Sequence, residues 1–310
     1  MIKNEAQIAG IRESVKINVA VLDYVAAHIR AGISTAEIDR WVYEQTTAMG
    51  GIPAPLNYEG FPKSVCTSID DQVCHGIPSE DDILCNGDII NVDCSTIYKG
   101  YYSDSSRMFI IGETTPEKKK LVEVTRECVM AGLEQVKPWG FLGDMGQAVH
   151  DLAKKNGYSV VRDVQSRRWA FSSRRAVGQL CDPARAEMVM APGMMFTIEP
   201  MINMGTDDIY VDADNDWTIY TEDGMPSAQW KFKCYGDGDG PRSHLVVRRP
   251  LSSPPQACLN PKPAARGQAS PFAAKRRGNL RVRFGRQPKY FAKSNAFQSR
   301  LQSGLRLKTS

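Results

Sequence analysis

Hydrophobic residues recur at helical spacing along much of the chain, and in other stretches they cluster or alternate as they do in strands. The helices predicted from this pattern span about residues 5–30, 35–49, 116–136 and 143–156. Ser34 and Glu37 form a capping box for the second helix. Thr115 and Pro116 supply the cap and the first residue of the third helix.

Stretches rich in β-branched and aromatic residues separate these helices and predict strands. The predicted strands span about residues 64–69, 89–97, 101–111, 158–163, 194–203 and 216–220. Helices and strands that alternate along about 230 residues indicate one large α/β domain with a full core. We place this domain at residues 1–235.

Two aspartates flank the turn of the predicted hairpin at residues 89–111. If the loop centres on Tyr98 and Lys99, Asp93 lies directly opposite Asp104. Opposed residues on one sheet face hold their Cβ atoms about 4.5–5.5 Å apart, so the two carboxylates repel unless a proton or a cation lies between them. The pair is therefore either two solvated hairpin acids or a bridge for a pair of divalent metal ions.

Several motifs around the hairpin carry a family resemblance. Ser-Val-Cys-Thr-Ser-Ile-Asp-Asp-Gln-Val-Cys-His75-Gly-Ile-Pro precedes it, and Pro-Gly-Met-Met-Phe-Thr-Ile-Glu199-Pro-Met follows it. Asp-Trp217-Thr-Ile-Tyr-Thr and Pro-Ser-Ala-Gln-Trp230 come next. In order and wording these motifs resemble the type I methionine aminopeptidases of the M24 metallopeptidase family, which also includes prolidase and creatinase. The resemblance covers about residues 1–164 and 187–230.

The resemblance implies an α/β "pita-bread" fold, in which two similar halves form a curved antiparallel sheet flanked by helices. It implies that Asp93, Asp104 and Glu199 bind two divalent metal ions (Co, Mn, Fe or Zn), and that His75 is catalytic and contacts the scissile peptide. It further implies a pocket for the methionine side chain, which Tyr58, Phe61, Cys66 and Trp217 would line. The expected reaction is removal of the initiator methionine from nascent polypeptides, with the ribosome as a further candidate partner.

The chain departs from the family pattern at three functional positions. Arg167 stands where the resemblance implies a histidine that binds metal, and Arg174 stands where it implies a histidine that contacts substrate. Lys231 stands where it implies a glutamate ligand. An arginine cannot bind a metal, and a lysine must lose its proton to do so. Such a cation is also able to occupy the vacated position and pair with Asp93 or Asp104.

Charge is distributed unevenly along the chain, whose formal net charge is +4. Residues 241–310 contain 16 Lys or Arg and no Asp or Glu, which leaves 23 basic and 35 acidic residues, a net charge of −12, in residues 1–240. We interpret residues 165–186 and the chain from about 231 as products of a shifted reading frame. The Pro, Ser and Gln content of residues 236–310 predicts a disordered basic tail rather than a specific nucleic-acid site.

The remaining features indicate the cytoplasm. No run approaches 18 apolar residues, and the first residues lack a signal-peptide core. Eight cysteines are scattered without metal-site or disulfide spacing, which is typical of reduced thiols. Two hypotheses remain open at this stage: a methionine aminopeptidase, and a catalytically inactive remnant or binding protein with a basic tail.

Overall fold

The described part of the chain combines four long helices with antiparallel strands, as the sequence predicts. The computed structural model describes residues 2–162, 188–237 and 240–243. The helices are α1 (Glu5–His28), α2 (Thr35–Ala48), α3 (Pro116–Glu134) and α4 (Leu142–Lys155). The side chains of Ser34 and Thr115 accept hydrogen bonds from the first turns of α2 and α3, which confirms both N-caps; of the predicted capping box, the structure shows the Ser34 half.

The strands differ more from the prediction than the helices do, because most of them are short. They are β1 (Ile52–Pro53), β2 (Cys66–Ile69), β3 (Gln72–Cys74), β4 (Ile89–Tyr98), β5 (Tyr101–Ile110), β6 (Ser159–Val160), β7 (Met195–Ile198), β8 (Met201–Asn203), β9 (Ile209–Val211), β10 (Ile219–Thr221), β11 (Ser227–Gln229), β12 (Phe232–Asp237) and β13 (Gly240–Ser243). Pro200 interrupts the strand predicted at 194–203 and separates β7 from β8. The three-residue strands β3, β9 and β11 are too short to produce a period in the sequence.

The hairpin of β4 and β5 turns one residue later than predicted. Lys99 and Gly100 both have positive φ values, 49° and 80°, as a two-residue primed turn requires. Asp93 therefore pairs with Ser106, and Asp104 pairs with Ser95. The prediction that Asp93 lies directly opposite Asp104 is wrong. The offset is an even number of residues, so the two carboxylates still share one sheet face.

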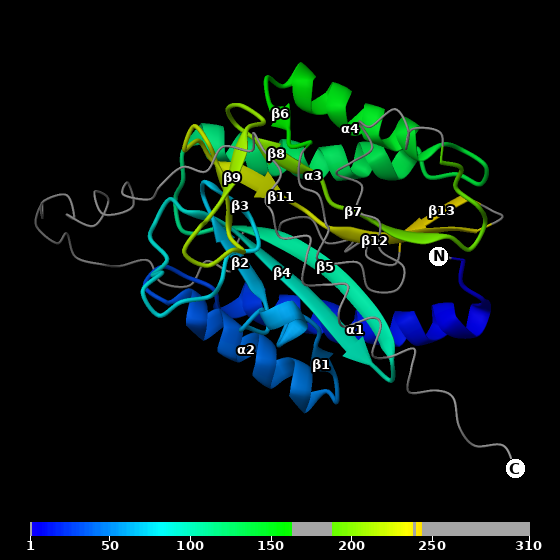
Figure 1. The fold of residues 1–310 in the computed structure, drawn as a ribbon, viewed down its shortest axis with the longest axis horizontal. Coiled ribbons are helices and arrows are strands. Elements are labelled where there is room, and N and C mark those ends of the chain that lie inside the picture. Colours follow the sequence, from blue (N-terminus) through cyan, green and yellow to red (C-terminus); the bar gives the residue numbers. More distant parts are fainter. Residues whose placement is uncertain (1, 163–187, 238–239, 244–310) are drawn as a thin grey trace, which may run out of the picture. The chain divides into compact units, whose positions relative to one another are not determined.

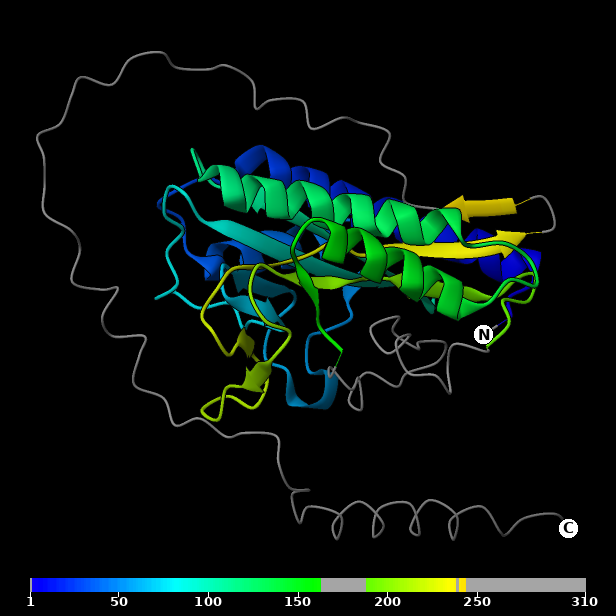
Figure 2. The same cartoon turned by 90° about the horizontal axis from the view of Figure 1, so that it is seen from above.

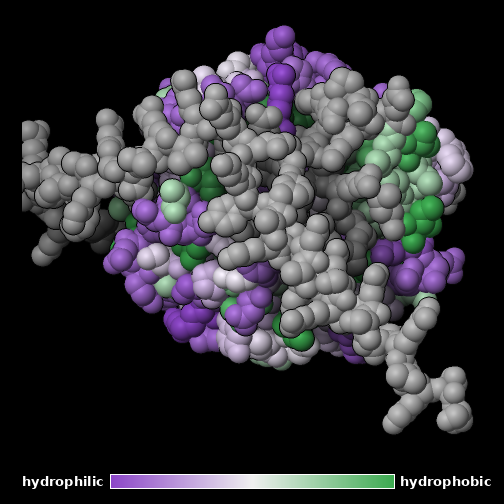
Figure 3. Space-filling model, in the orientation of Figure 1, coloured by the Kyte–Doolittle hydropathy of each residue, from purple (hydrophilic) through white to green (hydrophobic). Residues whose placement is uncertain are grey.

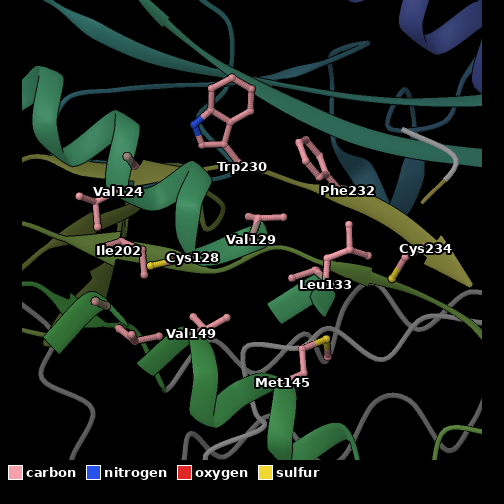
Figure 4. Packing of buried hydrophobic residues seen from close by; sticks show 14 of the residues in the cluster. Val124, Cys128, Val129, Leu133, Met145, Val149, Ile202, Trp230, Phe232 and Cys234 are labelled. Atoms are coloured by element: carbon pink, nitrogen blue, oxygen red, sulfur yellow. The ribbon is translucent and has the colours of Figure 1, made fainter. Parts of the chain in front are cut away.

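Two pairs of helices cover the strands (Figure 1). Helix α1 packs on β4 and β5 and also contacts α2. Helices α3 and α4 lie side by side, and α3 packs on β7, β8 and β11 (Figure 2). Each pair encloses its own hydrophobic core: Val21, Leu22 and Val92 belong to the core beside α1 and α2. The core beside α3 and α4 contains Cys128, Val129 and Met145 together with Trp230 and Phe232 (Figure 4).

Helix α1 is fastened to the hairpin by buried polar side chains as well as by apolar contacts. Asn18 is fully buried, donates a hydrogen bond to the Cys94 carbonyl at 2.8 Å and accepts one from the Ser105 hydroxyl. Ser14 is also fully buried. Its hydroxyl donates a hydrogen bond to the Thr96 carbonyl at 3.0 Å and forms another with the hydroxyl of Ser103 on β5. These pairings fix the position of α1 along β4 and β5, because buried polar groups lose stability without partners.

The surface of the described residues is largely hydrophilic in the view of Figure 3, with hydrophobic side chains gathered at one edge. Large exposed hydrophobic residues include Ile2, Trp139, Phe141 and Val189. Phe141 and Val189 are bridge partners, so these two lie on adjoining segments. None of the helices in the described ranges is long and apolar enough to cross a membrane.

The predicted end of the domain, at residue 235, falls inside a strand. Strand β12 runs to Asp237, pairs with β7 on one side and pairs with β13 on the other. Phe232 and Cys234 of β12 are buried in the core beside α3 and α4. The rest of the predicted tail, from residue 244, lies outside the described residues.

Replacing Asn18 with alanine is expected to destabilise the protein by about 1–3 kcal/mol, because it leaves the Cys94 carbonyl and the Ser105 hydroxyl buried without their partner. Urea unfolding followed by circular dichroism measures this loss. Lys16→Ala on the exposed side of the same helix is the control and should change the stability by less than about 0.5 kcal/mol. Equal effects of the two substitutions would contradict the assignment of Asn18 as the fastening residue.

Truncation distinguishes β12 from the basic segment beyond it. A chain that ends after Ser243 is expected to keep the urea midpoint of the full chain, because the composition of residues 244–310 predicts no contribution to the core. A chain that ends after Lys231 loses Phe232 and Cys234 from the core and is expected to lose cooperative unfolding. A lower urea midpoint for the chain that ends after Ser243 would mean that the basic segment supports the fold.

Candidate functional site

Three acidic side chains from separate strands converge on one lysine. Asp93 lies on β4, Asp104 lies on β5, and Glu199 follows β7 directly. The Nζ atom of Lys231 lies 2.7 Å from Asp93 Oδ2, 3.3 Å from Asp104 Oδ1 and 3.0 Å from Glu199 Oε2. All four side chains are at most 15% exposed. We call these four residues the carboxylate–lysine cluster.

The strand pairing explains why the cluster forms at this place. Lys231 forms an isolated antiparallel bridge with Ser106 of β5, and the Ser106 amide donates to the Lys231 carbonyl at 3.2 Å. Ser106 is also the register partner of Asp93 on β4. The chain then enters β12, whose pairing with β7 brings Glu199 alongside. The cluster therefore lies where the sheet of β4 and β5 meets the sheet of β7 and β12.

Two hydroxyl groups orient the carboxylates. Ser95 donates to Asp104 Oδ1 at 2.8 Å, and Thr197 donates to Glu199 Oε1 at 2.6 Å. Sequence reasoning missed both residues. The signal was the period of two: Ser95 lies two residues after Asp93 and Thr197 two residues before Glu199, so each shares a sheet face with an acid.

Burial and charge act in opposite directions within the cluster. Burial alone would lower the pKa of Lys231, but the three carboxylates together raise it well above its ordinary value, so the side chain is an ammonium. Burial raises the pKa of Asp93, and the nearby Lys231 ammonium opposes that rise. Asp93 Oδ1 is buried without a hydrogen-bond partner among the described residues. One ammonium thus compensates the three acids only in part.

An apolar group lies beside the acids. Phe61, Cys66 and Trp217 form one buried cluster, and the Phe61 and Trp217 rings meet edge to face with centroids 5.1 Å apart. Cys66 of β2 is the register partner of Asp93 of β4, which joins the apolar group to the acids. Of the four residues predicted to line a pocket, the structure brings these three together. The fourth, Tyr58, is half-buried in a short 3-10 turn and is not part of this buried cluster.

His75 lies in the loop after β3, and its ring faces the ring of Trp217 in the apolar group. Its ring is 6.5 Å from the Trp217 ring, centroid to centroid, in an edge-to-face arrangement. Burial, followed by the charge of Lys231, lowers the pKa of His75 to about 4, so the imidazole is neutral at neutral pH. The loop is tightly constrained, since a Cβ on Gly76 would lie 1.9 Å from the Thr67 carbonyl oxygen. Glycine at position 76 therefore lets the chain place His75 here.

The described residues do not fit a bound divalent metal ion. A metal needs several carboxylate, imidazole or thiolate ligands at about 2.0–2.3 Å. The point that faces Asp93, Asp104 and Glu199 is filled by the Lys231 ammonium. Within residues 2–162 and 188–237, no group of three or more histidine, cysteine or acidic side chains is arranged to hold a metal ion. Arg167 and Arg174 lie outside the described residues.

Comparison with known proteins identifies the fold and the family. Residues 9–229 match the model of metallopeptidase family M24. The chain is 42% identical over 236 residues to methionine aminopeptidase A of a Synechocystis strain, covering 76% of this chain and 92% of that protein. The crystal structure of methionine aminopeptidase from Rickettsia prowazekii has 34% identity and a TM-score of 0.70, covering 79% of this chain and 98% of that one.

A more distant neighbour supports the fold alone. Prolidase from Pyrococcus furiosus is 17% identical with a TM-score of 0.57, and the match covers 80% of this chain. Together these neighbours confirm the predicted α/β pita-bread fold. The family match and the identity to methionine aminopeptidases also confirm the resemblance from which the site residues were predicted. The chain belongs to metallopeptidase family M24 and is, by resemblance, an aminopeptidase of the methionine aminopeptidase type.

Proposed function

We propose that this chain acts on polypeptides that begin with methionine and that its reaction is hydrolysis of the first peptide bond. The observation that carries the proposal is the junction of two unlike groups: the apolar cluster of Phe61, Cys66 and Trp217 adjoins the buried acids through the Cys66–Asp93 pair. An unbranched thioether side chain suits apolar surroundings of this kind. Buried acids beside that pocket suit the positively charged amino terminus of the same residue.

The roles of the side chains follow from their positions. Phe61 and Trp217 would hold the methionine side chain, and the neutral imidazole of His75 would donate a hydrogen bond to the peptide group next to it. The family implies divalent metal ions as cofactors. We propose Asp93, Asp104 and Glu199 as the residues that would hold them if Lys231 were absent. With Lys231 in place, we expect little or no hydrolysis.

The substrates would be nascent polypeptides in the cytoplasm as they leave the ribosome. The relatives named above are peptidases, and they give no support to the alternative of a binding protein without catalytic function. The observation in favour of a weakened catalyst is the carboxylate–lysine cluster, because Phe61, Cys66 and Trp217 still lie together next to it.

Substitution of Trp217 tests the proposed pocket. Wild-type protein is expected to bind a Met-Ala-Ser peptide more tightly than a Lys-Ala-Ser peptide, and Trp217→Ala is expected to weaken binding of the first by about 10–100-fold through lost apolar contact (about 1.5–3 kcal/mol). Isothermal titration calorimetry gives the affinities, and released methionine is measured in parallel. Trp139→Ala, at a tryptophan that is 68% exposed, is the matched control and should leave both readouts unchanged.

Two results would contradict the proposal. One is equal affinity of the wild-type protein for the two peptides, with no release of methionine from either. The other is a Trp217→Ala variant that keeps its fold by circular dichroism and binds the methionine peptide as well as the wild type does.

A further inference from the structure

We propose that Lys231 replaces the divalent metal of this site: its ammonium supplies the positive charge that the three buried acids need, so the chain folds without metal and binds metal only when that ammonium is removed. The inference concerns the same residues as the proposed function and rests on it for the identity of the site. Its test does not depend on activity.

Geometry is the first argument. The Lys231 nitrogen lies within 3.3 Å of an oxygen from each of the three acids, which are contributed by β4, β5 and the end of β7. A position that contacts all three oxygens is the position that a shared cation must take. The Lys231 backbone is held there by its bridge to Ser106, so the side chain is delivered to the centre by the sheet itself.

Charge is the second argument. Asp93, Asp104 and Glu199 are each less than about one-sixth exposed and compete for one positive charge. Removing that charge would leave buried acids that repel one another at close range. A glutamate at position 231 would instead make four acids, whose charge two divalent ions would neutralise. The residue at position 231 therefore decides whether the centre is complete by itself or requires metal.

Lys233 is a second buried lysine of the same segment and provides a comparison for Lys231. Lys233 is also buried, at 7% exposure against 8% for Lys231, and lies two residues further along the chain. Its ammonium donates to the Tyr102 carbonyl at 2.7 Å. The Lys233 ammonium thus contacts a main-chain oxygen, whereas the Lys231 ammonium faces three carboxylates. The two lysines form a matched pair for substitution.

The experiment compares the full-length wild-type chain with Lys231→Glu, Lys231→Met and Lys233→Met after treatment with EDTA. The wild type is expected to contain no metal by mass spectrometry, and addition of 1 mM Mn²⁺ or Zn²⁺ should leave its Tm unchanged. In EDTA, Lys231→Met is expected to lower the Tm by roughly 6–20 °C, because a buried ion cluster loses its cation.

Metal rescue is the decisive readout. Mn²⁺ or Zn²⁺ should raise the Tm of Lys231→Glu by roughly 5–10 °C at saturating concentrations, and Lys231→Glu should bind the ion at least about tenfold more tightly than the wild type. Lys233→Met is destabilised too, but metal should not restore its Tm. Wild-type protein that retains a stoichiometric metal ion after EDTA overturns the proposal, even if the variants fail to fold. Equal metal responses of the variants at positions 231 and 233 also overturn it.

The proposed function and this inference fail separately. A wild type that binds methionine peptides but also binds metal tightly refutes only the role of Lys231. A metal-free, stable wild type with no preference for methionine peptides refutes only the proposed substrate.

Discussion

The structure depends on how the charge of three buried acids is compensated at one point. Asp93, Asp104 and Glu199 come from separate strands, and burial without a cation would force them apart or into their protonated forms. The Lys231 ammonium meets all three and is itself held by strand pairing to Ser106. Because Asp93 and Asp104 lie on β4 and β5 and Glu199 follows β7, this ion cluster also joins the sheet of β4 and β5 to the sheet of β7 and β12.

In the proposed function, this arrangement separates the residues for substrate recognition from the residues for chemistry. The apolar cluster of Phe61, Cys66 and Trp217 lies on one side of Asp93, and the lysine lies on the other. A change at position 231 therefore leaves the apolar group in place while it alters the charge at the centre. The residues that match the family model, 9–229, include the apolar cluster and the three acids and end before Lys231.

The sequence predicted the helices and the convergence of the acids, but the strands and the register less well. Helices such as α3 carry a cap, a proline at the first turn and several turns of periodic apolar residues, so several local signals agree. The register of the hairpin was wrong because Tyr98–Lys99 and Lys99–Gly100 are both plausible turns, and the positive φ of Gly100 decides between them. Ser95 and Thr197 were missed because hydroxyl side chains are common in strands, and only their contacts with Asp104 and Glu199 distinguish them.

The distance along the chain between the members of the cluster has a consequence for the order of folding. The β4–β5 hairpin closes over two residues, whereas α1 packs on it across 76 to 89 positions of sequence, as the Asn18–Cys94 and Ser14–Ser103 pairs show. Lys231 meets Asp93 across 138 positions of sequence. We therefore expect the acids on the hairpin to remain hydrated until the segment that carries Lys231 packs against them. Desolvation of the acids would then coincide with the arrival of the lysine, so we expect the sheet of β4 and β5 to join the sheet of β7 and β12 in a late, cooperative step of folding.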